Sequence, residues 1–524
     1  MPKDLDDTYA QILCRIDEDR SDTVITILKW LAYSARPLQI EELADIVTVK
    51  VDSTPRIDLE ARFLEPRDLL TICSSLVTTN LELKGSAIGQ MVGEQIKLAH
   101  LSVRDYLTSK RILSSKAFTY SIQEMRAHDT IAQICLAYLL QFGEDNELPE
   151  PEVSQPHFPL SKYAAKYWPY HINASGTESE EVVRLCMELF TNTKAFEAWI
   201  NIYDTDMVSS EGQMADGPPF RASPLYYVSQ VGLKKPVQLL LDSGARCSQY
   251  GGIYGYALQA AAAAGHHTTC QILLEGGREN IGADPDAQGG AANNALNAAC
   301  QEGHLGVVKI LLQKKANVNI TGGTFANPLQ AASAGGFYQI VEVLIGAGAN
   351  VDRVGGHYRT SLIAASYGGH EKVVEVLLAN GAEIESTDTS GRTPLSQAAS
   401  EGRTNVVRLL LKNGADVNHE DNDGWGPLDE ASPGGHYDCV VALLEAGAAV
   451  NAVDKEGNTA LHFTAAQPHP KVVRLLLDNG ADIHLANSRR EQVIYSAAWA
   501  GRYANLQILL EFGANVNALA DYMW

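Results

Sequence analysis

The sequence predicts an all-α-dominated protein in which an α-solenoid with short β-hairpins follows a mostly helical N-terminal region. Two observations support this fold class. An apolar pattern recurs at a constant interval over the last three-fifths of the chain, whereas the stretch from 1 to 215 shows helical patterns without that period. The length of 524 residues also exceeds what one compact core holds, while a solenoid grows in one dimension.

The charge of the chain indicates which class of binding partner to expect. The formal net charge is −22, which works against binding a phosphate backbone and favours a protein partner with a basic surface. Residues 1–7 are acidic and lack a signal-type apolar segment, and no apolar run approaches the length of a membrane span. The eight cysteines form no CxxC pair. We therefore expect reduced thiols in a cytoplasmic protein, with the nucleus as a second compartment.

The N-terminal region begins with three helical patterns, followed by one more helix and two β-rich stretches. The helices are predicted at Thr8–Ile16, Val24–Tyr33, Ile40–Val47 and Arg67–Val77, and the strands at Leu76–Leu83 and Gln95–Leu101, separated by Gly85–Gly93. This order predicts a winged-helix-like module over residues 1–115. A helical linker module is expected over residues 116–215.

The candidate recognition helix of that module is Arg67–Val77. It holds one arginine, one aspartate and otherwise apolar or hydroxyl residues. Reading DNA requires a basic flank, which is absent here. A structural or protein-contact role is therefore favoured for this module, and no direct nucleic-acid partner is expected.

The repeat is located by the leucine or isoleucine that opens each Leu-x-x-Ala-Ala-like helix. These residues are Leu225, Leu258, Leu296, Leu329, Leu362, Leu395, Leu428, Leu461 and Ile494. Every step equals that from Leu225 to Leu258, except the next one, from Leu258 to Leu296, which is five positions longer. The extra positions are expected in Arg278–Gly290, a stretch rich in Gly and Asp that is typical of a loop.

The sixth unit shows why each repeat folds into a pair of helices. Thr393 is suited to cap a helix whose first position is Pro394. Gly402 is expected to end that helix in the left-handed conformation. Val406 to Leu411 predict a second, more apolar helix. Leu410 is therefore expected in the core, and its replacement by alanine is expected to cost about 2–5 kcal/mol.

These units resemble the ankyrin-repeat family. The resemblance rests on Thr393-Pro394-Leu395 and on Asn458-Thr-Ala-Leu461-His462, which match the family's T-P-L-H signature. It implies nine stacked helix pairs with projecting β-hairpins over residues 219–524. It also implies that hairpin tips and the exposed ends of the first helices hold a protein partner, whose identity the sequence leaves open.

The binding positions implied by this resemblance follow from the repeat phase. The residues predicted to contact the partner are Arg359, Tyr367, Arg392, Asp423, Trp425, Asn458, Arg489 and Trp499. Trp, Tyr and Arg supply most interface hot spots, so Tyr367, Trp425 and Trp499 are expected to form a contact stripe with the arginines between them. The alternative is that Trp425 folds back onto its own stack.

Three N-terminal motifs resemble the segment that follows the ATPase domain in fungal NACHT–ankyrin proteins, which are NOD-like receptors of the STAND class. The motifs are Pro2–Leu13, Leu98–Leu107 and Pro159–His171. In such receptors this segment links a nucleotide switch to the repeat sensor. A P-loop requires Gly-Lys, and the sequence contains no such dipeptide. The chain is therefore expected to lack the NTPase domain of such receptors, with its nucleotide switch lost, supplied by another chain, or cut away by the limits of this chain.

No arrangement typical of catalysis is found. The segment His419–Glu430 mimics a calcium loop, but a histidine occupies its first position and Pro427 its ninth, so an ankyrin hairpin turn is favoured. No nucleophile–base set, cofactor motif or metal motif is predicted. The sequence predicts a non-catalytic scaffold or sensor fragment that binds a protein. The alternative is a nuclear transcription co-regulator that acts by protein contact.

Overall fold

The computed structural model describes residues 3–58, 66–73, 75–84, 91–143, 158–204, 206, 221–278 and 282–517. The protein is dominated by helices and divides into two compact units. The first unit comprises Met1–Pro219 and Leu233–Ser243, and the second comprises Phe220–Gly232 and Gly244–Trp524. The predicted modules 1–115 and 116–215 fall in the first unit, and the boundary between them stays a prediction. The predicted start of the repeat domain, residue 219, lies outside the described residues.

The first half of the first unit combines short helices with a three-stranded antiparallel sheet in the order β1-β3-β2. Its main elements are α1 (Lys3–Leu13), α2 (Ser21–Tyr33), β1 (Leu38–Gln39), α3 (Ile40–Ile46), the 3₁₀ turn η3 (Pro66–Asp68), α4 (Leu69–Cys73), β2 (Val77–Lys84), β3 (Met91–Leu98) and α5 (Leu101–Leu107). β2 and β3 pair from Val77 opposite Leu98 to Lys84 opposite Met91. Part of the predicted connection between these strands, residues 85–90, lies outside the described residues.

Two predictions in this half were wrong. The candidate recognition helix Arg67–Val77 is only the turn η3 and the five-residue helix α4, and Val77 already belongs to β2. The second strand begins at Met91 and ends at Leu98, not at Leu101. His100 caps the following helix instead, because its Nδ1 accepts a hydrogen bond from the Ser102 backbone N–H at 3.1 Å.

The second half of the first unit is helical. It contains α6 (Glu124–Leu140), α7 (Ser161–Ser175), α8 (Glu180–Thr191), α9 (Thr193–Ile202) and α12 (Lys234–Asp242). Its core is aromatic: the fully buried rings of Trp168 and Trp199 lie 5.6 Å apart, and Trp199 Nε1 donates to the carbonyl oxygen of Ala165 at 3.0 Å. The carboxylate of Glu178 accepts from the backbone N–H groups of Lys234 and Lys235 at 2.6 and 2.7 Å, and so caps α12 within this unit.

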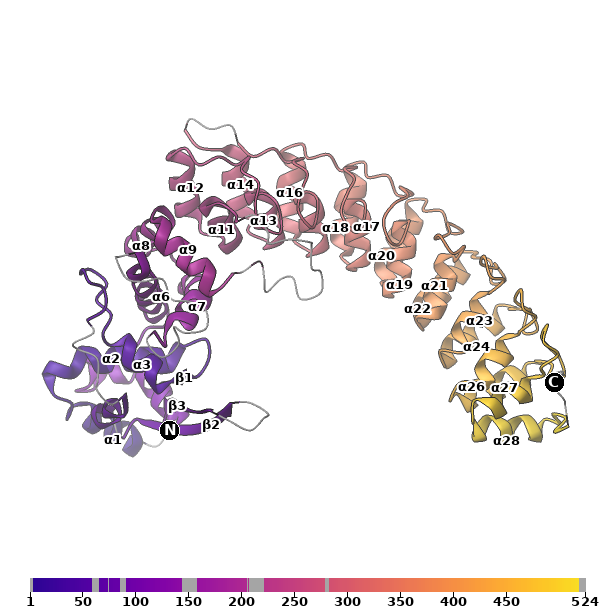
Figure 1. Ribbon diagram of the computed structural model, residues 1–524, viewed down its shortest axis with the longest axis horizontal. Coiled ribbons are helices and arrows are strands. Elements are labelled where there is room, and N and C mark those ends of the chain that lie inside the picture. Colours follow the sequence, from indigo (N-terminus) through magenta and orange to yellow (C-terminus); the bar gives the residue numbers. More distant parts are fainter. Residues whose placement is uncertain are drawn as a thin grey trace. The chain divides into compact units, whose positions relative to one another are not determined.

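The second unit contains α11 (Pro224–Val231) and a row of helix pairs. The pairs are α13 (Ala257–Ala263) and α14 (His267–Glu275), α15 (Ala295–Gln301) and α16 (Leu305–Gln313), α17 (Pro328–Ala334) and α18 (Tyr338–Gly346), α19 (Ser361–Gly368) and α20 (Glu371–Ala379), α21 (Pro394–Ser400) and α22 (Thr404–Lys412), α23 (Pro427–Ala431) and α24 (Tyr437–Glu445), α25 (Ala460–Ala465) and α26 (Pro470–Asp478), α27 (Val493–Trp499) and α28 (Tyr503–Glu511). Within this unit the pairs follow one another side by side from α13 to α28 (Figure 1).

The sixth predicted unit folds as its residues indicate. Thr393 Oγ1 accepts from the Ser396 N–H at 3.2 Å, and Pro394 opens α21. Gly402 follows the helix with φ +67°, which the left-handed turn requires. Leu410 is fully buried, so its predicted place in the core is confirmed.

Backbone hydrogen bonds join the tips of successive hairpins. The Asn422 N–H donates to the Ser390 carbonyl at 2.9 Å, and the Lys455 N–H donates to the Asp423 carbonyl at 3.1 Å. The Ser488 N–H then donates to the Glu456 carbonyl at 2.7 Å. The hairpins from the sixth to the ninth unit therefore share one hydrogen-bonded edge, which holds side chains of neighbouring hairpins in fixed register. Across the described part of the chain, no helix is long and apolar enough to cross a membrane.

Candidate protein-binding surface

A hollow of about 360 Å³ lies at the tips of three successive hairpins in the second unit. The residues that line it are Arg392, Asp421, Asp423, Trp425, Asp454, Lys455, Glu456, Asn458 and Phe463. We call it the tip hollow. Four residues predicted from the repeat phase, namely Arg392, Asp423, Trp425 and Asn458, come together here.

Trp425 forms the aromatic wall of the tip hollow. Its ring centroid lies 4.3 Å from that of Phe463 in α25, with an angle of 39° between the ring planes. The indole is half-buried. Part of the ring therefore packs on the next repeat, as the alternative prediction held, and the remainder is exposed to the hollow.

Arg392 does not extend into solvent as a free contact residue. Its guanidinium lies 2.8 Å from a carboxylate oxygen of Glu430 and 3.6 Å from Asp421 Oδ2. Both carboxylates are buried, at 7% and 4% exposure, whereas the Arg392 side chain is about one-third exposed. Most of its positive charge is thus compensated within the repeat stack, and only its outer part is available to a partner.

Two of the lining carboxylates hold the hairpin turns. Asp421 Oδ1 accepts from the backbone N–H groups of Asp423 and Trp425 at 2.8 and 2.9 Å. Asp454 Oδ1 accepts in the same way from Glu456 and Asn458 at 2.9 and 2.7 Å. These aspartates shape the tips and so position the side chains that follow them.

The other two carboxylates are exposed and available. The Asp423 carboxylate makes no hydrogen bond or ion pair with any residue that the structure describes. The Glu456 carboxylate lies 3.8 Å from Arg489, and both of these side chains are about 70% exposed. Such an exposed pair contributes little energy. Arg489, another predicted contact residue, therefore lies at the edge of the hollow and is held there only weakly.

Buried acids lie beneath the hollow. Burial, reinforced by the negative charge of Asp454, raises the pKa of Asp429 to about 7, although a hydrogen bond from the Gly426 N–H opposes the shift. Burial also raises the pKa of Glu430, against the positive charge of Arg392. With a pKa of about 7, Asp429 changes its charge near neutral pH.

The remaining predicted residues lie outside the tip hollow. Tyr367, at 37% exposure, belongs to α19, and its ring lies 5.4 Å from that of Tyr358. Arg359, in the hairpin before α19, is half-buried and has φ +62°. Trp499, at 80% exposure, ends α27. Three helix pairs separate α19 from α27 in the row (Figure 1), so the predicted stripe is divided into separate patches.

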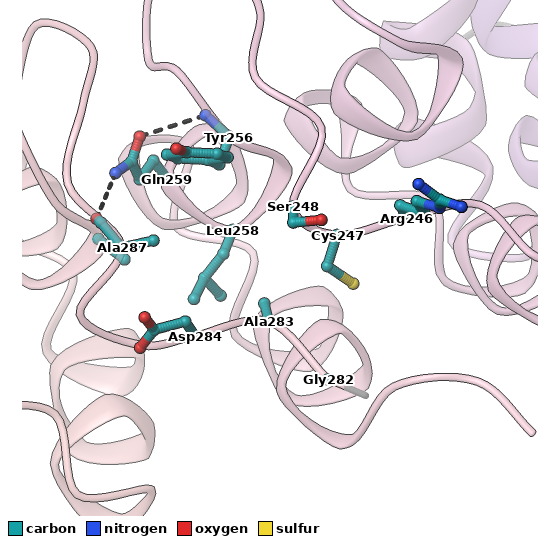
Figure 2. Close-up of a pocket in the computed structure, with 11 residues that line it drawn as sticks. Arg246, Cys247, Ser248, Tyr256, Leu258, Gln259, Gly282, Ala283, Asp284 and Ala287 are labelled. Atoms are coloured by element: carbon teal, nitrogen blue, oxygen red, sulfur yellow. Dashed lines mark hydrogen bonds between the residues drawn. The ribbon is translucent and has the colours of Figure 1, made fainter. Parts of the chain in front are cut away.

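A second hollow, which the sequence did not predict, lies where the repeat step lengthens between Leu258 and Leu296. Its volume is about 700 Å³, and its walls include Arg246, Cys247 and Asp284. Figure 2 shows Gln259 joining the Tyr256 N–H to the Ala287 carbonyl at 3.2 and 2.8 Å. The longer repeat step in the sequence indicated an irregular segment, from which we predicted a loop but not a hollow. Residues 279–281 of that loop lie outside the described residues.

Four residues were missed as members of the tip hollow, namely Asp421, Asp454, Lys455 and Phe463. Asp454 and Lys455 lie in the hairpin that also carries Asn458, so the repeat phase placed them nearby. Phe463 lies on a helix, and no pattern indicated that it would cover the indole of Trp425. Among the described residues, no group of three or more His, Cys, Asp or Glu side chains is arranged to hold a metal ion.

The part of the chain that matches a known family profile lies mainly in the second unit. The family profile described as "Ankyrin repeats (3 copies)" matches residues 225–322, 259–355, 322–388, 361–454 and 428–520. A protein of Monascus ruber, "Azaphilone pigments biosynthesis cluster protein L", is 38% identical over 294 residues, which are 53% of this chain and 60% of the relative. The chain thus spans less than two thirds of that relative's length.

Proposed function

The chain belongs to the ankyrin-repeat proteins, and from this premise we propose that its second unit binds a protein partner as a non-catalytic scaffold or sensor fragment. The observation that carries the proposal is the convergence of Arg392, Asp423, Trp425 and Asn458 in one hollow. These residues come from three successive hairpins, whose register is fixed by backbone hydrogen bonds. A partly exposed tryptophan with surrounding polar groups has the composition of an interface hot spot.

The proposed contact surface also includes the exposed aromatic rings of Tyr367 and Trp499, whose repeats precede and follow those of the tip hollow in the row. A partner long enough to touch all three patches gains from each of them. A shorter partner contacts the tip hollow alone. The proposal therefore makes Trp425 the centre of the surface and the other two aromatic residues its outer contacts.

Affinity purification with the full chain as bait tests this function. Tyr367, Trp425 and Trp499 are replaced together by alanine, and the recovery of each co-purifying protein is quantified by mass spectrometry. We expect recovery of the specific partner to fall by about tenfold or more, because hot-spot residues contribute about 2 kcal/mol each.

The matched control is Tyr437→Ala. Tyr437 is also an exposed aromatic residue, at 43%, but it opens the second helix α24 rather than a hairpin or a first helix. The control should retain the partner. If the triple variant keeps its native circular dichroism and retains every partner of the unchanged protein, the proposed surface is wrong.

For the first unit, we propose a winged-helix arrangement that serves protein contact, as in the coupling segment of NACHT–ankyrin receptors. The order of α2, β1, α3, α4 and the β2–β3 hairpin, with sheet order β1-β3-β2, supports this proposal. Arg67, the one cation of the candidate recognition segment, donates to Glu94 at 2.8 Å. We expect no salt-sensitive binding of duplex DNA in an electrophoretic shift assay. Such binding would refute the protein-contact role.

The proposed compartment is the cytoplasm. The eight cysteines are all free thiols in the structure, and seven of them are buried. Burial raises the pKa of buried thiols such as Cys73, to about 12, which keeps them protonated and unreactive. Imaging of a tagged full chain tests the compartment, and a nuclear signal would favour the co-regulator alternative.

A further inference from the structure

The chemistry of the tip hollow indicates which kind of partner side chain it accepts. This inference rests on the proposed protein-binding function and concerns the same surface. Four carboxylates and two cationic side chains line the hollow, so negative charge predominates.

The two cations of the hollow are engaged. Arg392 pairs with buried Glu430 and Asp421. Lys455 Nζ donates to the backbone carbonyl of Asn422. Neither group is free to receive an acidic partner side chain without giving up a contact within the stack.

The carboxylates of Asp423 and Glu456 are, by contrast, available. Both are exposed, Asp423 is unpaired among the described residues, and Glu456 has only its long contact with Arg489. They belong to neighbouring hairpins, which the hydrogen bond from Lys455 N–H to the Asp423 carbonyl holds together. The hollow therefore presents two available carboxylates on hairpins whose backbones are held in register.

The exposed part of the Trp425 indole completes the hollow. Phe463 supports the ring from one side at a centroid distance of 4.3 Å, so the indole is held in place without a ligand. Tryptophan is the strongest aromatic partner of a cation. A planar guanidinium stacks on such a ring while its N–H groups reach carboxylates, whereas an ammonium acts as a point charge.

We propose that the tip hollow accepts an arginine side chain from a basic segment of the partner protein, stacked on Trp425 and hydrogen-bonded to Asp423 and Glu456. The overall charge of −22 agrees with a basic partner, since it attracts such a segment from a distance. Pairing is expected to weaken as salt is added, because both carboxylates are exposed.

Nuclear magnetic resonance of the full chain with ¹⁵N-labelled tryptophan tests this inference. The indole signal of Trp425 is assigned with the variant Trp425→Phe. Short peptides that are otherwise uncharged and differ only at one central residue, Arg, Lys or Gln, are then added. We expect the Arg peptide to move the Trp425 signal saturably and more strongly than the Lys peptide, and the Gln peptide to leave it unchanged.

Variants then identify the carboxylates involved. Asp423→Asn and Glu456→Gln should each weaken binding of the Arg peptide by roughly two- to fivefold. The control Glu342→Gln removes the same charge from an exposed position on α18 and should leave binding unchanged. These surface changes preserve the packing of Trp425, so the test does not depend on a variant that fails to fold.

Two results would overturn the inference: no saturable movement of the Trp425 signal with the Arg peptide, or equal movement with the Gln peptide. If either occurs while the triple alanine variant still loses its partner, the surface is correct and the partner chemistry is wrong. If partner recovery is also unchanged in the triple variant, the proposed function of this surface fails as well.

Discussion

The two units of this chain are stabilised in different ways. The core of the repeat unit consists of small and medium aliphatic residues that recur at each step, such as Ala398, Ala399 and Leu410. The core of the first unit contains large aromatic side chains, including Trp168 and Trp199, that occur once and pack on one another. The repeat unit uses the same kind of local contact in every repeat, whereas the first unit depends on contacts that each occur once.

This difference in packing predicts how far the destabilisation caused by a core substitution should extend in each unit. In a solenoid each repeat contacts only its neighbours, so a defect remains close to its origin. In the first unit, helix α6 contacts α7, α8 and α9, and α9 also contacts α7 and α8. A defect in that shared core should therefore destabilise several helices together.

The largest expected effect comes from Trp199→Ala. It removes a fully buried indole that packs on Trp168 and donates to the Ala165 carbonyl. We expect a loss of about 3–5 kcal/mol in the first unit. Hydrogen exchange of the full chain, measured by mass spectrometry, should show faster exchange across α6 to α9 together.

The matched change in the repeat unit is Leu410→Ala, which should cost about 2–5 kcal/mol. Faster exchange should here be confined to α22 and the neighbouring helix pairs. Exchange that rises across the whole repeat unit would contradict the comparison, as would a Trp199→Ala effect restricted to α9.

The second prediction concerns acid sensitivity of the first unit. His128 Nδ1 and His171 Nδ1 lie 2.8 Å apart, and the Tyr163 hydroxyl lies 2.9 Å from His171 Nε2. Only one proton fits between the two Nδ1 atoms, so a doubly protonated pair is disfavoured. Burial, aided by His128, lowers the pKa of His171 to about 3, and burial also lowers that of His128.

Because the folded pKa of His171 lies below its unfolded value, the unfolded chain binds more protons between pH 6.5 and 3. Stability of the first unit is therefore complete above pH 6.5 and falls as the solution is acidified. We expect a loss of about 2 kcal/mol at pH 5 relative to pH 7. Hydrogen exchange in α6 and α7 measures it, and His171→Gln should reduce the dependence on pH.

In the repeat unit, we expect the opposite dependence of stability on pH, because a buried acid there loses its proton as pH rises. In the third and fourth repeats, the amide side chain one position after the repeat leucine donates to the next hairpin: Asn297 Nδ2 to the Gly322 carbonyl at 2.8 Å, and Gln330 Nε2 to the Gly355 carbonyl at 3.0 Å. Asp429 occupies this position in the seventh unit and has no amide to donate. Its raised folded pKa of about 7 means that its contribution to stability is present at low pH and is lost as pH rises through 7.

Asp429→Asn should therefore stabilise the seventh and eighth repeats more at pH 8 than at pH 5, by roughly 2–3 kcal/mol, because only the wild-type carboxyl ionises over this range. Exchange in α23 and α25 at the two pH values provides the measurement. Ser396→Ala changes the same position of the sixth repeat without a titratable group, and its effect should not depend on pH. An equal effect of Asp429→Asn at both pH values would contradict the assignment.

The repeat unit was predictable because its contacts recur. The constant repeat step places Thr393, Pro394 and Gly402 in their capping and turn positions without knowledge of any other part of the chain. The same phase brought Trp425 to the hairpin tip. It did not predict that Phe463 would cover part of the ring, since that contact depends on side-chain orientation in the next repeat.

The first unit was less predictable because its contacts join residues far apart in the sequence. No local pattern links Tyr138 to Asp45, whose side chains are hydrogen-bonded at 2.6 Å. The short helix α4 was overestimated because apolar residues resume at Leu76 and Val77, only two serines after the end of the helix at Cys73. Apolar periodicity does not mark where a helix ends when the next strand is also apolar.

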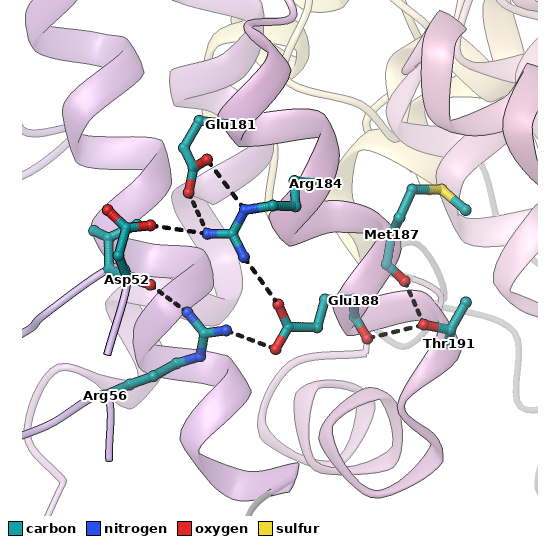
Figure 3. A network of polar contacts seen from close by, with 8 residues as sticks. Asp52, Arg56, Glu181, Arg184, Met187, Glu188 and Thr191 are labelled. Carbon is teal, nitrogen blue, oxygen red and sulfur yellow. Dashed lines mark hydrogen bonds and ion pairs between the residues drawn. The ribbon is translucent and has the colours of Figure 1, made fainter. Parts of the chain in front are cut away.

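The smallest expected effect on stability comes from removing one ion pair in each unit. In the first unit, the Arg56 side chain is 9% exposed; it lies 2.6 Å from Glu188 and also donates to the Val51 carbonyl (Figure 3). In the repeat unit, Arg408 lies 3.3 Å from Glu445, and both side chains are more than half exposed. We expect Arg56→Met to cost about 1–2 kcal/mol, because it removes buried hydrogen bonds to a charged group.

Arg408→Met should change stability by less than about 1 kcal/mol, since solvent and salt screen the exposed pair. Thermal unfolding of the full chain at low and high salt compares the two variants. Added salt should reduce the effect of Arg408→Met further and leave most of that of Arg56→Met. Equal costs with equal salt dependence would show that the ion pairs of the two units are equivalent, despite their difference in burial.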